Sequence, residues 1–131
     1  MSARRTWAGC AAVVAALSFA GCGGGGDDGI SVQEKLTVIR ARADVGTFCG
    51  VYKSQPSELY DRAFDSLLTS VRDLSRIYDD NPDAEIEIPV EKKKLTLEQI
   101  VQAQSRALRK CGQDGRQQAG VLDAALQQQQ S

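Results

Sequence analysis

The fold of this chain is constrained most by one long amphipathic repeat, between residues 57 and 78. Apolar residues recur there at spacings of three and four, which places them along one face of an α-helix. Pro56 and Ser57 suit the start of a helix, and Pro82 follows its end. We therefore predict a helix over residues 57–78 whose apolar face must pack on other parts of the chain. That face comprises Leu59, Ala63, Phe64, Leu67, Val71, Leu74 and Tyr78.

A second helix is predicted to begin at Thr96. Thr96 and Gln99 have the spacing of a capping box, in which each side chain accepts a hydrogen bond from the backbone N–H of the other residue. Leu95 and Ile100 occupy the two positions of a hydrophobic staple. We expect this helix to end near residue 111, with Gly112 as its left-handed cap. Its inner face contains one polar residue and comprises Leu97, Ile100, Val101, Gln104, Leu108 and Cys111.

The segment 31–49 is compatible with two structures. Leu36 and Val38 would lie on one side of a strand, whereas a larger set of apolar residues nearly follows helical spacing. A helix is the better interpretation because most of the intervening residues are good helix formers and nothing nearby supplies a sheet. The residues with near-helical spacing are Val32, Leu36, Ile39, Ala43 and Phe48.

The remaining segments carry weaker signals. Residues 85–88 alternate between charged and apolar, but Pro89 limits them to an edge strand or an extended loop. Residues 113–131 contain a possible short helix around Leu122 and end in a run of four glutamines, which we expect to be disordered. The predicted fold class is therefore all-α, a small three-helix assembly over residues 31–112 followed by a disordered Gln-rich tail.

The first residues have the layout of an export signal. Arg4 and Arg5 precede an apolar run over residues 8–20, and the small residue Gly21 follows directly. As a helix this run would span about 20 Å, short of the roughly 30 Å hydrocarbon core of a bilayer, so it is poorly suited to remain as a transmembrane helix. The two arginines fit either the general secretory or the twin-arginine export route.

The end of this run, Phe19-Ala20-Gly21-Cys22, resembles the lipobox of bacterial lipoproteins, with Phe19 where an aliphatic residue is usual. The resemblance implies that a diacylglyceryl group is attached to the thiol of Cys22 and that residues 1–21 are then removed. Two acyl chains are enough for stable attachment to a membrane. The resemblance thus implies that the lipid bilayer is a partner of this protein.

The residues that follow the lipobox support the same interpretation. Residues 22–30 are rich in Gly and Asp and have almost nothing to bury, which is typical of a flexible tether. The folded part is then expected on the extracytoplasmic side of the cell membrane, a short distance from the lipid.

The resemblance also assigns the four cysteines. Cys10 would leave with the signal and Cys22 would carry the lipid, so Cys49 and Cys111 would remain as an even pair in an oxidising compartment. A disulfide between them is the favoured interpretation. A metal site would need further ligands, and a redox pair is normally spaced as Cys-x-x-Cys. The bridge would pin the end of the first predicted helix to the end of the last.

Composition excludes several functions. The chain has no His, which removes the commonest general base at neutral pH, and its net charge of -1 disfavours a nucleic-acid partner. Asp61, Asp65 and Asp73 lie near one side of a predicted helix, but interleaved arginines indicate a solvated face rather than an acid–base pair. Lysines 92–94 are interpreted as a solvated charged turn. We therefore expect no catalytic residue, no cofactor and no enzymatic activity.

One metal-site candidate is weak. Asp79, Asn81 and Asp83 give the D-x-N-x-D opening of a calcium loop. The sixth position is Ala84 instead of Gly, and the twelfth is Val90 instead of a bidentate Glu. A turn that ends a helix explains the same residues, so no metal is expected.

These observations predict a non-enzymatic, membrane-anchored lipoprotein of the bacterial cell envelope. Its helical domain would bind an envelope protein or another envelope component. Two alternatives are a lipoprotein that binds a small ligand or metal ion and a structural spacer.

Overall fold

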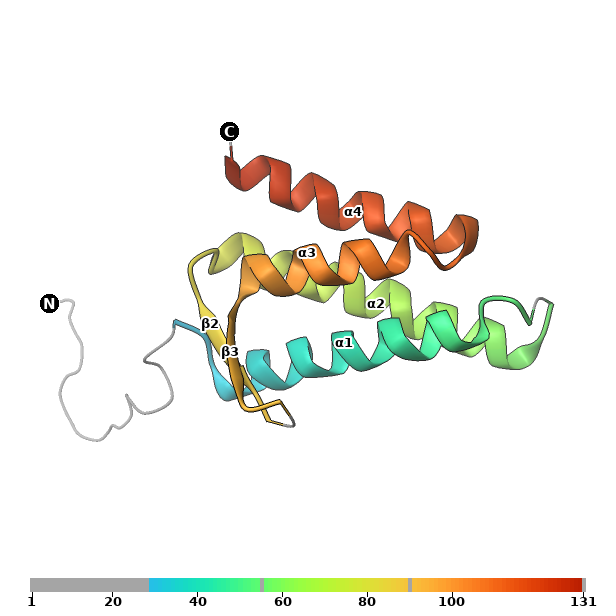
Figure 1. Cartoon of the computed structure of the whole chain (residues 1–131), viewed down its shortest axis with the longest axis horizontal. Helices are drawn as coiled ribbons and strands as arrows, with labels where there is room; N and C mark the ends of the chain where they lie inside the picture. The colour runs from blue at the N-terminus through green and yellow to red at the C-terminus, as the bar shows by residue number, and fades with distance from the viewer. Residues whose placement is uncertain (1–28, 55, 90, 131) are drawn as a thin grey trace, which may run out of the picture. The chain divides into compact units, whose positions relative to one another are not determined.

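The computed structural model describes residues 29–54, 56–89 and 91–130. The predictions for the export signal and for Cys22, which concern residues up to 28, lie outside this part. Within the described residues the chain forms four helices and one two-stranded hairpin (Figure 1). In chain order these are α1 (Val32–Val51), α2 (Glu58–Asp80), β2 (Glu85–Ile88), β3 (Lys93–Thr96), α3 (Leu97–Leu108) and α4 (Gly112–Gln130).

Helix α2 is the predicted central helix. The Oγ of Ser57 accepts a hydrogen bond from the N–H of Tyr60 at 3.0 Å, so Ser57, one of the two residues expected at the start of this helix, is its N-cap. At the other end, the backbone N–H of Asn81 donates to the Ile77 and Tyr78 carbonyls. One face of α2 is buried, which confirms the predicted amphipathic pattern except at Leu59, which was expected on this face but is 58% exposed. Its apolar members are Tyr60, Ala63, Leu67, Val71, Leu74, Ile77 and Tyr78.

Helix α3 begins with the predicted capping box. The Thr96 N–H donates to Gln99 Oε1 at 2.9 Å, and the Gln99 N–H donates to Thr96 Oγ1 at 3.1 Å. The helix ends at Leu108, earlier than predicted, and Cys111 lies in the turn that follows. Gly112 has a φ of 80°, the left-handed conformation expected of it.

The segment that could have been helix or strand is helix α1, but its buried face differs from the predicted one. Leu36, expected inside, is 55% exposed. Apolar residues occur on several sides of this helix, so periodicity alone selects the wrong face. The face that is buried comprises Val38, Ala41, Val45 and Phe48.

The C-terminal segment corrects the predicted fold, because it is a fourth helix rather than a disordered tail. Helix α4 packs against α3 and α2 (Figure 1). A Cβ added to Gly115 would lie 2.4 Å from the Leu108 carbonyl oxygen, so only glycine allows this approach. Small residues bury little apolar area and give a weak sequence signal, while glutamine is a good helix former. The buried stripe comprises Gly115, Ala119, Leu122 and Ala125.

Strands β2 and β3 form an antiparallel hairpin in which Glu85 pairs with Thr96 and Ile88 with Lys93. Pro89 follows the last paired residue of β2, in agreement with the predicted edge strand or extended loop. The alternation of residues 85–88 buries the two isoleucines and exposes the two glutamates. The hairpin therefore adds Ile88 to the same core that the helices form.

The packing of α4 predicts that Leu122→Ala lowers the free energy of unfolding by about 2–5 kcal/mol, because this fully buried side chain leaves a cavity. Its neighbour Val121 is 43% exposed and provides the matched control, Val121→Ala. Urea unfolding followed by circular dichroism measures both. Equal, small effects of the two substitutions would contradict the packing of α4.

Candidate functional site

A disulfide joins the last turn of α1 to the connection between α3 and α4. Cys49 and Cys111 are 62 positions apart in sequence, and their sulfur atoms are bonded at 1.96 Å. The Cys49 sulfur lies 3.8 Å from the Ala107 carbonyl oxygen, so the bridge brings α1 against the end of α3. This is the pair that the sequence predicts. Each of its two cysteines lines one of the recesses described below, Cys111 a polar pocket and Cys49 an apolar groove.

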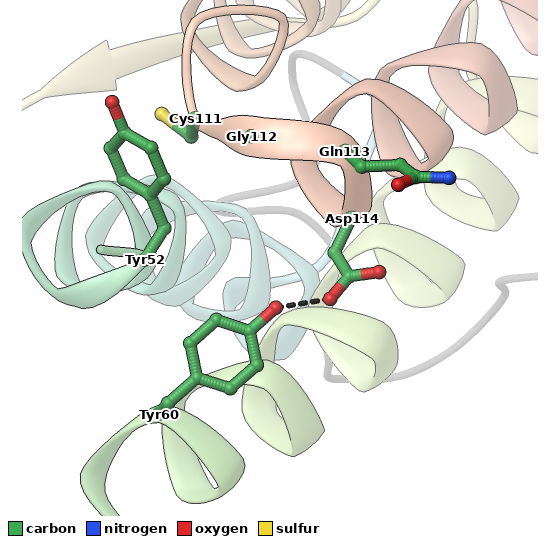
Figure 2. A pocket seen from close by; sticks show the side chains of 6 residues that line it. All are labelled: Tyr52, Tyr60, Cys111, Gly112, Gln113 and Asp114. Carbon is green, nitrogen blue, oxygen red and sulfur yellow. Dashed lines mark hydrogen bonds between the residues drawn. The ribbon is translucent and has the colours of Figure 1, made fainter. Parts of the chain in front are cut away.

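The first recess is a polar pocket of about 240 Å³ beside the disulfide (Figure 2). The hydroxyl of Tyr60 donates to the carboxylate of Asp114, which comes from the first turn of α4. Figure 2 shows Tyr52 on the opposite side, with Gly112 between. A Cβ at Gly112 would lie 3.1 Å from the Tyr52 ring, so the pocket depends on this glycine.

Aromatic side chains pack against Tyr60, one of the residues that line the polar pocket. The Phe48 ring lies 5.5 Å from that of Tyr60, and the Phe64 ring stacks on Tyr60 at 6.0 Å. Such contacts fix the orientation of the phenol. The Tyr60–Asp114 hydrogen bond in this pocket joins α2 to the first turn of α4.

A second polar recess lies between α1 and α2 and has a volume of about 340 Å³. Two of the three carboxylates considered from the sequence, Asp65 and Asp73, line it, whereas Asp61 does not. Asp44 accepts a hydrogen bond from the buried Ser70. Asp73 lies 3.6 Å from Arg76, which agrees with the solvated, charge-paired face that the sequence predicts.

The largest of the described recesses is an apolar groove between α1, the hairpin and α3, which we call the α1–α3 groove. Its volume is about 490 Å³, within the range of ligand sites. Ile39 and Gly46 line it from α1, Ile88 and Pro89 from the hairpin, and Ala107 from α3. Two further lining residues, Arg42 and Glu91, form an ion pair with their charged atoms 3.2 Å apart.

The α1–α3 groove also contains Gln104, the polar exception that the sequence places on the inner face of α3. Three polar residues are buried in the described ranges, and two of them are serines with carboxylate partners. Ser70 donates to Asp44, and Ser105 donates to Asp123 at 2.6 Å. Gln104 is only 8% exposed, yet within the described ranges its side-chain amide has no hydrogen-bond partner.

The candidate metal residues lie at the end of α2. The Nδ2 of Asn81 donates to the Ile77 carbonyl at 3.1 Å, so this side chain closes the helix. Across the described ranges, no three His, Cys, Asp or Glu side chains are grouped so that they could hold a metal ion. Asp79 and Asp83 instead influence the pKa of Tyr78 through their negative charges. Burial raises the pKa of Tyr78, and the negative charges of Glu98, Asp79 and Asp83 raise it further.

Comparison with known proteins gives no relative, since no protein-family model, curated protein or solved structure matches the chain. In the part that the structure describes, no helix is both long enough and apolar enough to cross a bilayer. The residues themselves therefore carry the functional argument. Sequence reasoning identified the disulfide and singled out Gln104, but it missed both the polar pocket and the α1–α3 groove, because residues from separate elements form each of them.

Removing the disulfide tests its structural role. In the double variant Cys49→Ala/Cys111→Ala, the free energy of unfolding should fall by up to about 4 kcal/mol, because the unfolded chain regains the entropy of a long loop. Urea unfolding measures this, with the reduced wild-type protein as control, which should match the variant. A loss below about 1 kcal/mol would contradict the role assigned to the bridge.

The environment of Tyr78 predicts a specific pH dependence. Because its pKa is raised above the ordinary value of 10.0, the folded state releases this proton less readily than the unfolded state. Stability is therefore complete below about pH 10 and decreases as the pH rises through the folded pKa. In Tyr78→Phe this loss is absent, so the free energy of unfolding of wild type minus that of the variant should decrease as the pH rises from about 8 to about 11. If urea unfolding shows that the stabilities of wild type and Tyr78→Phe change in parallel with pH, this prediction is wrong.

Proposed function

We propose that this chain is a lipid-anchored lipoprotein of the bacterial cell envelope and that its helical domain is a non-enzymatic binding module. The anchor would be a diacylglyceryl group on Cys22, after cleavage of residues 1–21. The support for this part is the order of charged residues, apolar run, lipobox-like sequence and Gly-rich segment in the first 30 residues.

The disulfide supports export. Such bridges form and persist in oxidising compartments and are rare where thiols are kept reduced. A domain of this size also has a limited core, so a covalent link between α1 and the α3–α4 connection is a substantial part of its stability. Cys49 and Cys111 are thus suited to a protein that works outside the cytoplasm.

The binding role rests on one observation, the buried side-chain amide of Gln104 in the α1–α3 groove, which has no hydrogen-bond partner among the residues that the structure describes. If position 104 served only to fill the protein core, an apolar residue would be favoured there, because a buried polar group without a partner is destabilising. A groove that a partner fills removes this penalty in the complex. Among the described residues that line the groove, Arg42 and Glu91 are the one pair of titratable groups, and they form an ion pair, which suits binding rather than catalysis.

The intact mass of the chain purified from bacterial membranes tests the anchor. We expect a chain that begins at Cys22, carries the lipid, and lacks two hydrogens because of the disulfide. In the control Cys22→Ala, the lipid should be absent and residues 1–21 retained. A wild-type mass equal to that of the full, unmodified sequence would refute the proposal.

A further inference from the structure

The chemistry of Gln104 restricts what the α1–α3 groove can bind. Its side-chain amide presents an N–H₂ donor and a carbonyl acceptor, and neither has a partner within the described residues. An acyl chain offers no hydrogen bond to either group, and a carboxylate only accepts. A peptide bond offers one N–H and one carbonyl together, so it satisfies both halves of the amide.

The walls of the groove suit the remainder of a peptide. Ile39, Ile88 and Pro89 are apolar and favour apolar side chains. Ala43 and Gly46 lie on the same face of α1, three positions apart, and their small size allows a backbone to approach closely. The lining also contains the Arg42–Glu91 ion pair, whose charges balance, so the groove is not expected to favour a charged ligand.

We propose that the α1–α3 groove binds an extended, apolar peptide segment of a partner protein, with one peptide bond paired to the side-chain amide of Gln104. This inference rests on the proposed function and names the chemistry of the partner. It does not depend on lipidation, because every residue that carries it lies within α1, the hairpin and α3.

Gly46 offers a way to fill the groove. A Cβ added at this position meets nothing within 4 Å, so a larger side chain can be accommodated without a clash inside the protein. Gly120 on α4 is also helical, exposed and free of contacts within 4 Å, and it does not line the groove. Gly46→Leu and Gly120→Leu therefore form a matched pair, of which only the first obstructs the site.

Gln104→Leu separates binding from folding. Leucine is similar in size and needs no hydrogen bond, so the free protein should unfold at a higher temperature than wild type. The same substitution removes the group that pairs with the peptide. We expect higher thermal stability together with loss of peptide binding, a combination that a merely structural glutamine would not give.

The test uses the protein purified from bacterial envelopes and held in lipid nanodiscs. The probe is a pool of capped nonapeptides whose central positions vary among Ala, Val, Ile, Leu and Thr. Peptides retained by wild type should bind Gly46→Leu and Gln104→Leu at least about tenfold more weakly, and Gly120→Leu equally well. The side-chain amide resonances of Gln104 should shift when a retained peptide is added, and affinity should change little with salt.

Three results would overturn the inference. One is a pool from which wild type retains no peptide. Another is equal binding by Gly46→Leu and Gly120→Leu. The third is binding of palmitate or phosphatidylglycerol vesicles, instead of peptide, that Gly46→Leu abolishes, since this would assign the groove to acyl chains. The intact mass of the same preparation reports the lipid anchor separately, so failure of the groove and failure of the anchor are distinguishable.

Discussion

The Cys49–Cys111 disulfide is the constraint on which the position of α1 depends. Helix α4 packs closely on α3 and α2, whereas α1 approaches these helices less closely along its length. Side chains complete its attachment, chiefly the buried Phe48, whose ring meets Tyr60 and Phe64. Because Cys49 itself lines the α1–α3 groove, the bond that secures the helix also sets one wall of the site.

The two terminal helices are held by opposite physical means. Helix α4 buries small residues, and Gly115 lets its backbone approach that of α3. Helix α1 is attached by a covalent bond and by large aromatic side chains, and its backbone lies close to the other helices over less of its length. Close packing leaves little space between helices, while wide separation leaves recesses. This contrast agrees with the position of the two larger recesses described above, both of which are lined by residues of α1.

Sequence reasoning succeeded where a signal is local. Ser57 and the Thr96–Gln99 pair specify helix starts through hydrogen bonds over three residues, and both were identified correctly. It failed for the buried face of α1, because apolar residues there occur on several sides. It also failed for α4, whose small buried residues signal a close approach only once α3 is in place. The α1–α3 groove could not be predicted, since three separate elements form it.

Gln104 is the residue that both stands out in the sequence and lines the proposed binding groove. On sequence alone it was a single polar residue on an apolar helix face, a pattern compatible with a satisfied core residue. The structure distinguishes it from Ser70 and Ser105, which are also buried but are hydrogen-bonded to carboxylates. Cys49, which lines the groove around it, is held by the disulfide, and disulfides persist mainly in oxidising compartments. For a protein exported as we propose, the oxidising environment that keeps the Cys49–Cys111 bond intact therefore also keeps this wall of the binding groove in place.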